Sequence, residues 1–328
     1  MGTNKARQAR APGSLLARRE RTAWLLLLPA ILVILLVAAY PLYRTIYFSL
    51  TDASYLRPGE EKFIGLENYV FLLQDATWWT AVRNTVVFSV TSVLLELLLG
   101  LGVALILNSQ FRARGLVRAA ILIPWAIPTV VSSQMWSWMY QDVLGVVNDI
   151  FLRLHLISER VGWLAASGTG ILNLILKNLN IISEPVPWLP DISVTMASII
   201  AVDVWKTTPF VALLLLAGLQ SIPDDIYEAA RVDGAGALRQ FFRITLPLLK
   251  PAILITLIFR TLDALRVFDV IQVMKSTDIA TISMSVYDRQ LLVEFNKLGY
   301  GSAVAVAIFL VISVFTVIYI TSSRVRFD

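Results

Sequence analysis

The sequence contains no cysteine and only one histidine, and charged residues occupy only 16% of its 328 positions. Without cysteine the chain has no disulfide bonds and no thiolate metal site. His155 is isolated, and the carboxylates do not gather as metal binding or acid–base catalysis requires. The sequence also lacks a G-x-x-x-x-G-K-[ST] phosphate-binding loop. We therefore expect that the chain is not an enzyme and that it binds no metal or cofactor itself.

Apolar residues are abundant instead, because 57% of the residues are hydrophobic and the mean hydropathy is +0.71. Soluble domains are about 45–50% apolar and about 25% charged, so the excess indicates lipid as the solvent. A helix needs about 20 apolar residues to cross a bilayer. Six such runs predict an all-α integral membrane protein with six transmembrane helices, at 23–48, 84–107, 119–140, 193–219, 250–273 and 301–322.

The first apolar run follows a basic stretch, as the apolar part of a signal peptide does. The run is too long for a signal peptide, and no small-residue cleavage site follows it. We therefore expect a basic cytoplasmic tail at 1–22 and a transmembrane region at 23–328. Lys and Arg favour cytoplasmic segments, and their distribution predicts that both termini and the loop 220–249 are cytoplasmic. The net charge of +5 is then a topology signal, so nucleic-acid binding is not expected.

One outer segment contains an internal repeat. Residues 145–164 and 170–189 align without gaps at an offset of 25 residues, and ten of the twenty positions are identical. The repeat is either a local duplication that lengthened an outer loop at 145–189 or a docking surface for an outer partner. Its apolar stretch 171–182 rises only about 18 Å as a helix, short of the roughly 30 Å hydrocarbon core. We expect an outer-face or re-entrant helix there, not a seventh span.

The loop 220–249 is polar although apolar spans flank it on both sides. Ser221 and Asp224 resemble a capping box, which predicts a first helix at about 222–232. Gly234 and Gly236 allow a bend, and a second amphipathic helix follows and ends near Pro247. This helix–turn–helix has an apolar face that its own length cannot bury, so the loop is expected to dock on a partner or to lie at the membrane interface.

The spacing in this loop matches a known motif. Glu228-Ala229-Ala230 is followed after three residues by Gly234 and after nine more by Ile244-x-Leu246-Pro247. This pattern resembles the EAA loop of ABC importer permeases. The likeness to the first permease subunit of maltose/trehalose-type sugar importers covers nearly the whole chain, through "FIGLENYV" (63–70), "ILIPWAIPTVV" (121–131), "VDVWKTTPF" (202–210) and "FRTLDALRVFDV" (259–270).

The resemblance implies a cytoplasmic coupling helix that sits in a groove of an ATPase subunit. The residues that it assigns to this contact and its bend are Glu228, Ala229, Ala230, Asp233 and Gly234. It also implies a prokaryotic inner-membrane location and four kinds of partner: a second homologous permease, an ABC ATPase dimer that binds the ATP, an extracytoplasmic sugar-binding protein, and lipid. The sugar is expected to be a disaccharide such as trehalose or maltose.

Ionisable residues inside spans are costly and mark pathways or partners. Arg260, Asp263, Arg266 and Asp269 alternate in sign at intervals of three in the fifth run, and Asp203 and Lys206 have the same interval in the fourth. Residues three apart are helix neighbours, so these charges either hold helices together or line a polar pathway. The resemblance places sugar contacts here and assigns to the substrate path Lys206, Thr207, Phe210, Arg260, Asp263 and Arg266.

The charges depart from the maltose pattern, where neutral Ser and Asn side chains stand near Asp263, and "VDVWKTTPF" looks closer to trehalose- or α-glucoside-type members. Glu96 is a further carboxylate in the second span with no evident partner in the sequence, and packing and gating are both open for it. An importer of another solute such as glycerol 3-phosphate remains an alternative. A secondary transporter is a second one, although no paired inverted halves are evident.

Overall fold

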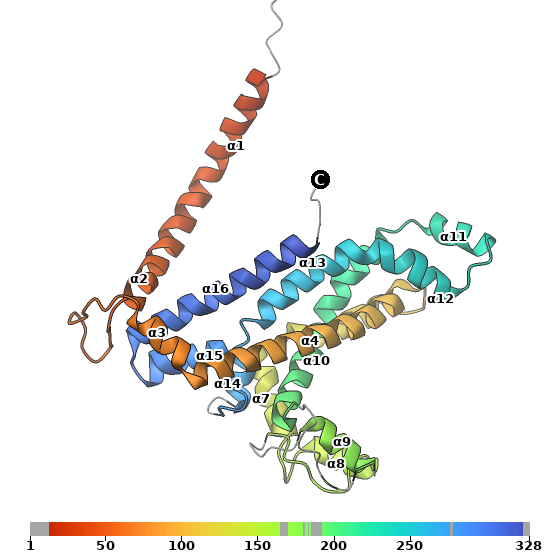
Figure 1. Cartoon of the computed structure of the whole chain (residues 1–328). Helices are drawn as coiled ribbons and strands as arrows, with labels where there is room; N and C mark the ends of the chain where they lie inside the picture. The colour runs from red at the N-terminus through yellow and green to blue at the C-terminus, as the bar shows by residue number, and fades with distance from the viewer. Residues whose placement is uncertain are drawn as a thin grey trace, which may run out of the picture.

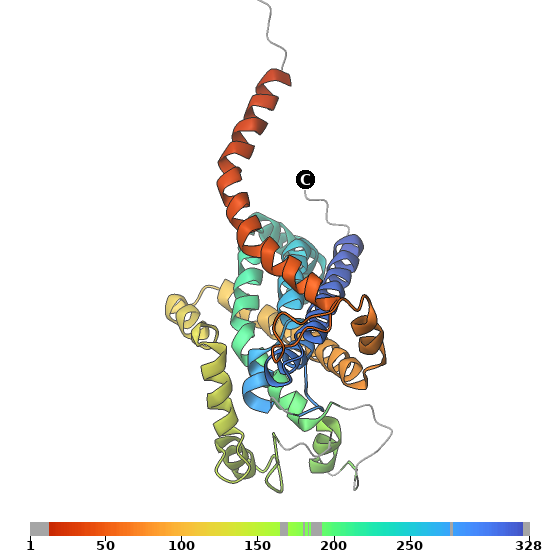
Figure 2. The same cartoon turned by 90° about the vertical axis from the view of Figure 1, so that its left-hand side faces the viewer.

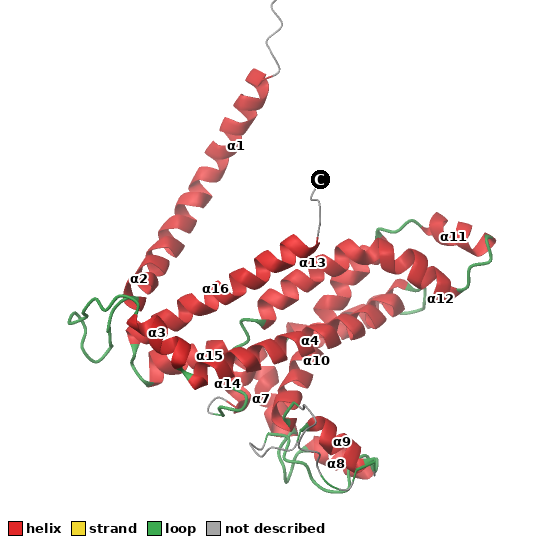
Figure 3. Cartoon of the chain, in the orientation of Figure 1, coloured by secondary structure: helices red, strands yellow, loops and turns green. Residues whose placement is uncertain are grey.

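The computed structural model describes residues 13–164, 170–179, 181–182, 184, 192–275 and 278–323. In these residues the chain is helical, and β-structure is limited to two isolated bridges (Figure 3). Five helical stretches among them are long and apolar enough to cross a membrane: Glu20–Ser49, Ala76–Asn108, Val194–Gln220, Ala237–Ala264 and Leu298–Ile318. A sixth crossing arises when a bent helix pair is counted as one span, so the predicted six-span, all-α architecture is confirmed.

The first span projects away from the rest of the bundle (Figure 1). It consists of α1 (Gly13–Ile34), a π-helical turn (Leu35–Ala39) and α2 (Tyr40–Ser49), and only α2 packs on α16 (Leu298–Ser323). From Trp24 onward the apolar side chains of α1 are exposed, apart from the partly buried Ile31, which is the pattern of a helix whose solvent is lipid or another membrane helix. Figure 2 shows the same separation from the side.

The third span, predicted at 119–140, is a broken helix. α5 (Arg114–Ile121) and α6 (Ile123–Ala126) precede α7 (Thr129–Met139), and the two halves meet at 88°. Proline has no N–H, and the residue before it is driven to an extended backbone. Ile127 has this conformation, with ψ 132° directly before Pro128, so the break follows from the sequence.

The core of the bundle is the long contact between α4 (Ala76–Asn108) and α10 (Val194–Gln220), with α13 (Leu246–Ala264) against both. Gly100 allows this close approach, because a Cβ there would lie 2.5 Å from Cγ1 of Val211. Gly218 has the same function against α13, where a Cβ would lie 2.4 Å from the Cβ of Ala252. Small residues at helix crossings are typical of membrane bundles.

The fifth span begins and ends earlier than the predicted 250–273, because its helical stretch covers Ala237–Ala264. α13 ends at Ala264, and after a non-helical stretch α14 (Asp269–Lys275) begins as a separate helix. The charges at 260, 263, 266 and 269 therefore do not form one continuous helical stripe, as the interval of three predicted. Arg266 and Asp269 follow the end of the span, and the break turns the chain back toward the bundle.

The end of the bundle that holds α3 (Glu67–Gln74) and α15 (Met284–Arg289) is joined by polar contacts. α3 leads to Asp75, which accepts hydrogen bonds from the hydroxyls of Tyr287, on α15, and of Tyr300, on α16, the latter at 2.7 Å. Burial alone would raise the pKa of Asp75, but these bonds and those from the backbone N–H groups of Thr77 and Trp78 outweigh it, and the pKa is lowered. A second π-helical turn (Gln290–Glu294) connects α15 toward α16.

Both copies of the 25-residue repeat begin with a short helix, α8 (Val146–Arg153) and α9 (Ile171–Asn178). α9 has only eight residues, which confirms that 171–182 is not a span. Asn148 is fully buried, and Asn173, its counterpart, is buried as well. The helices lie near the start of α10, at the end opposite α11 (Asp224–Val232) (Figure 1). Most of the second copy beyond α9 lies outside the described residues.

Candidate solute pathway and coupling segment

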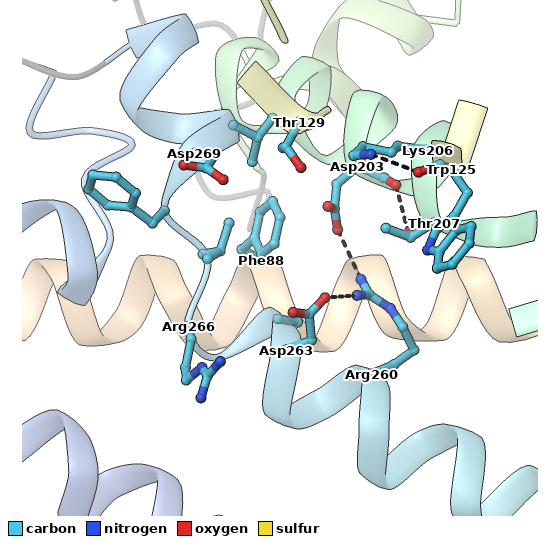
Figure 4. A pocket seen from close by; sticks show the side chains of 14 residues that line it. Phe88, Trp125, Thr129, Asp203, Lys206, Thr207, Arg260, Asp263, Arg266 and Asp269 are labelled. Atoms are coloured by element: carbon cyan, nitrogen blue, oxygen red, sulfur yellow. Dashed lines mark hydrogen bonds and ion pairs between the residues drawn. The ribbon is translucent and has the colours of Figure 1, made fainter. Parts of the chain in front are cut away.

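A polar cavity of about 250 Å³ lies between the fourth and fifth spans and the break in the third. Figure 4 shows side chains from α4, α10 and α13 converging on it. The structure brings the predicted residues Lys206, Thr207, Arg260, Asp263 and Arg266 to this one cavity, where Trp125, Asp203 and Asp269 also line the wall. Phe210, also predicted, does not line the cavity, but its ring stacks on that of Trp125, which does.

Arg260 is the centre of a buried ion network. Its Nε lies 2.5 Å from Oε2 of Glu96, and its Nη2 lies 2.7 Å from Oε1 of the same carboxylate. The same Nη2 lies 3.1 Å from Oδ2 of Asp203, and Nη1 pairs with Asp263. Only 3% of the Arg260 side chain and none of Glu96 is exposed. The planar guanidinium provides the fixed fork that such paired contacts require.

Glu96 therefore has the partner that the sequence did not reveal. The two residues are 164 positions apart, so no local spacing relates them. The signal available in the sequence was a carboxylate without a partner in the second span, together with two arginines in the fifth. Buried charges need partners, and matching the two would have predicted the contact.

Thr207 completes the buried side of the network. Its hydroxyl lies 2.6 Å from Oε1 of Glu96 and 2.7 Å from the carbonyl oxygen of Asp203. A hydroxyl has one proton, so it donates to one of these acceptors at a time. Because Glu96 accepts from both Arg260 and Thr207, it connects α4 with α10 and α13. This arrangement supports the interpretation that some of these charges hold the helices together.

Asp263 differs from Glu96, because 69% of its side chain is exposed while it pairs with Arg260. Arg266 and Asp269 line the same cavity, and the structure shows no ion pair for either within the described residues. Among the residues that the structure describes, no three His, Cys, Asp or Glu side chains are grouped as a metal site requires. The cavity thus presents carboxylate acceptors and cationic donors to a bound molecule, which suits hydrogen bonding to hydroxyl groups.

Lys206 and Phe210 both contact the broken third span. The Lys206 ammonium donates to the carbonyl oxygens of Ile127, at 2.6 Å, and Trp125, at 3.3 Å. The Phe210 ring stacks on that of Trp125, with centroids 5.8 Å apart and 12° between the planes. Prediction from the sequence placed Lys206 beside Asp203 on its own helix, whereas its hydrogen bonds cross to another element.

We call the polar loop 220–249 the coupling segment, and it lies at the other end of α10. α11 is followed by Gly234, whose φ of +75° is a left-handed conformation that side chains with a Cβ resist. The predicted bend at Gly234 is confirmed. The capping box is wrong, because the N-cap of α11 is Pro223 and the Ser221 hydroxyl instead donates to the Gly218 carbonyl.

The second helix does not end near Pro247. α12 (Ala237–Gln240) passes through a π-helical turn (Phe241–Thr245) into α13, so one helical stretch runs from the coupling segment into the fifth span. Pro247 is the second residue of α13 and follows the π-helical turn, where the regular hydrogen bonding between residues four apart is already interrupted. One continuous helix therefore joins α12 to Arg260, and α11 is connected to it through the turn at Gly234.

The surface of the coupling segment is exposed. Glu228 is 69% exposed and its nearest cation, Arg231, stands 4.0 Å away. Val232 is 88% exposed, Leu238 76% and Phe242 60%. Ala229 is exposed as well, and Asp233 ends α11. This mixed apolar and charged surface has no cover within the described residues of the chain.

Comparison with known proteins places the chain in a family. The model of the binding-protein-dependent transport system inner membrane component matches residues 96–326. The chain belongs to this family. The match includes every residue that lines the polar cavity except Phe88 of α4, and it includes the whole coupling segment. Members of this transport family are multi-pass membrane components, which agrees with the membrane-length helices.

Three relatives match over nearly their whole length. The chain is 38% identical to the trehalose/maltose transport system permease protein MalF of Thermococcus litoralis, covering 95% of this chain and 96% of that protein. It is 38% identical to the trehalose transport system permease protein SugA of Mycobacterium tuberculosis (94% and 90% covered). It is 37% identical to the sulfoquinovosyl glycerol transport system permease protein SmoG of Agrobacterium fabrum (93% and 91%).

The fold also matches a solved structure, that of a bacterial ABC transporter involved in the import of the acidic polysaccharide alginate. The TM-score is 0.74 at 23% identity, covering 94% of this chain and 96% of that chain. The alginate transporter in complex with alginate pentasaccharide-bound periplasmic protein gives 0.75. The predicted ABC importer permease fold is confirmed by this likeness.

Proposed function

We propose that the chain is a permease subunit of an ATP-driven importer and forms half of the translocation path for a sugar, a disaccharide such as trehalose or maltose. The observation that carries the proposal is the polar cavity around Arg260, located between membrane-length helices and connected by continuous helix to an exposed coupling segment. The trehalose and maltose permeases among the relatives support the sugar class.

The cavity supplies the chemistry for a hydroxyl-rich solute. Asp263 accepts hydrogen bonds from sugar hydroxyls, and its ion pair with the buried Arg260 orients the Asp263 carboxylate. Trp125 provides an apolar ring at the cavity wall, and the apolar C–H face of a sugar ring packs well on an aromatic ring. Arg266 and Asp269 add a donor and an acceptor near the same opening. The solute passes these groups without a covalent step.

The partners follow from what the chain leaves uncovered. A second homologous permease completes the path, and an ABC ATPase dimer binds the coupling segment through Glu228, Ala229 and Ala230, with Asp233 and Gly234 forming the turn. An extracytoplasmic binding protein delivers the sugar. The periplasmic protein bound to the alginate transporter supports this last partner. Both termini are cytoplasmic in this arrangement, and the membrane is the inner membrane of a prokaryote.

Coupling is mechanical in this proposal. ATP binding closes the ATPase dimer and moves α11 and α12, and the continuous helix into α13 carries the displacement to the break at Ala264. The loop after this break lines the cavity. A displacement of the α12 end of the helix therefore changes the cavity at its other end. The cavity then switches from facing inward to facing outward.

Uptake of labelled solutes tests the proposed function. Cells with and without the gene are given trehalose, maltose, a longer maltodextrin or glycerol 3-phosphate, and an Asp263→Ala variant is run in parallel. We expect saturable, gene-dependent uptake of one disaccharide and its loss in the variant. Gene-dependent uptake of glycerol 3-phosphate alone would replace the sugar assignment. Uptake that continues after ATP is depleted would favour a secondary transporter.

A further inference from the structure

The break in the third span exposes backbone carbonyls within the membrane region. Pro128 has no N–H, and the extended Ile127 ends the hydrogen-bond ladder of α6. Lipid offers no donors to such carbonyls, so irregular backbone at membrane depth must be satisfied by protein or by a water-filled cavity. The carbonyls of Trp125 and Ile127 stand at this break, and both accept from one side chain, Lys206 of α10.

The Lys206 ammonium is committed to these carbonyls. Its side chain is buried, with 8% exposed, and within the described residues it forms no ion pair with the carboxylates of the cavity. An ammonium has three protons to donate, and two are directed at the break. A neutral side chain of the same length would leave both carbonyls without a donor.

Phe210 makes a second contact with the same segment. Lys206 and Phe210 are four residues apart on α10, so they lie on one face of the helix. The first binds the backbone on either side of Ala126, and the second stacks on the ring of Trp125. Two side chains of one helix face thus hold a four-residue helix and place the Trp125 ring at the cavity wall.

We propose that Lys206 is a positioning residue that fastens the broken third span to α10 and thereby sets the Trp125 wall of the cavity. The resemblance assigned Lys206 to the substrate path, but two of its three ammonium protons are already directed at the break. The proposal concerns the position of α6 and α7 relative to the bundle. It therefore does not depend on which solute is carried or on the identity of the ATPase.

Because the chain has no cysteine, spin labels can be attached at two introduced cysteines only. Val131→Cys on α7 and Val90→Cys on α4 are exposed positions outside the cavity. The distance distribution between them is measured by pulsed electron paramagnetic resonance on the full chain in lipid nanodiscs. Lys206→Met removes the donors at nearly constant length, Lys206→Arg restores donors, and Lys250→Met is the matched control at an exposed lysine of α13.

We expect one narrow distribution for the parent, Lys206→Arg and Lys250→Met, and a broadened or displaced one for Lys206→Met. Uptake should fall in Lys206→Met and recover largely in Lys206→Arg. A parent-like distribution in Lys206→Met would overturn the proposal. Lost uptake with unchanged distances would do so too, because it would show that Lys206 acts on the solute itself.

A further variant covers the case in which Lys206→Met does not accumulate. Phe210→Leu removes the ring stack and leaves the ammonium in place, and we expect an intermediate broadening. An unchanged distribution in Phe210→Leu would then contradict the two-contact arrangement. Failure of all sugar uptake in the parent would reject the proposed function and leave these distance results standing.

Discussion

The cavity and the coupling segment differ in whether their charged side chains are paired within the chain. Around Arg260 the chain satisfies its own buried charges, through Glu96, Asp203 and Asp263. In the coupling segment Glu228 and the apolar side chains near it are exposed and have little to contact within the chain. Loss of any side chain from the buried ion network should therefore lower the stability of the fold. Substitutions on the exposed coupling segment should leave folding unchanged and affect only the binding of a partner.

The largest effect should come from breaking the self-contained region. Arg260→Met leaves three carboxylates facing one another without their cation, and removing one member of a buried ion group costs about 3–5 kcal/mol. We expect a large loss of folded chain, measured by thermal unfolding and yield in detergent. Arg266→Met is the control, since no ion pair of Arg266 is lost, and equal losses in both variants would contradict the network.

The coupling segment should respond in function and not in folding. Gly234→Pro cannot adopt the φ of +75° because proline is fixed near −65°, so the turn is remodelled. We expect normal membrane insertion, with ATP hydrolysis by the assembled importer no longer coupled to uptake. Gly236 already has φ −68° and ψ 165°, so Gly236→Pro should transport nearly normally. Normal transport by Gly234→Pro would remove the coupling role of this turn.

The outer repeat offers an intermediate case. The Asn148 side chain accepts from the N–H of Val161 and Nε1 of Trp163 and donates to the carbonyls of Asp142 and Val161. Asn148→Leu leaves these groups unpaired, at about 1–3 kcal/mol for each that stays buried. We expect faster proteolysis at 142–164 with the membrane core intact. The neighbouring Asp149→Asn, at a half-exposed side chain, is a control, and equal cleavage in both variants would argue against the Asn148 cluster.

The smallest effect is a pH dependence at Asp288, on α15. Burial raises its pKa to about 7, and one of its oxygens has no hydrogen-bond partner. Since the folded state then holds its proton to higher pH than the unfolded state does, stability falls as the pH rises from about 4 to about 7. Asp288→Asn should remove this decline, by a few kcal/mol at most. Unfolding is measured at about pH 4 and about pH 7. An equal change in stability between these pH values in the parent and in Asp288→Asn would contradict the prediction.

The sequence predicted regular features well and tertiary ones poorly. The fourth and sixth spans lie within a few residues of their predicted bounds, because length and hydropathy determine them. Pro124 and Pro128 signalled the broken third span but were not interpreted as a break. The Glu96–Arg260 pair joins two spans whose contact depends on how the whole bundle packs. The interval of three among the fifth-span charges was misleading, because α13 ends at Ala264.

The contrast between the two regions depends on the coupling segment being a cytoplasmic surface that an ATPase covers. The absence of cysteine makes one measurement direct: Ala229→Cys is reacted with a membrane-impermeant maleimide in oriented vesicles, with and without the ATPase subunit. We predict labelling from the cytoplasmic side only, and protection when the ATPase is bound. Labelling from the outer side, or labelling that the ATPase leaves unchanged, would contradict the account.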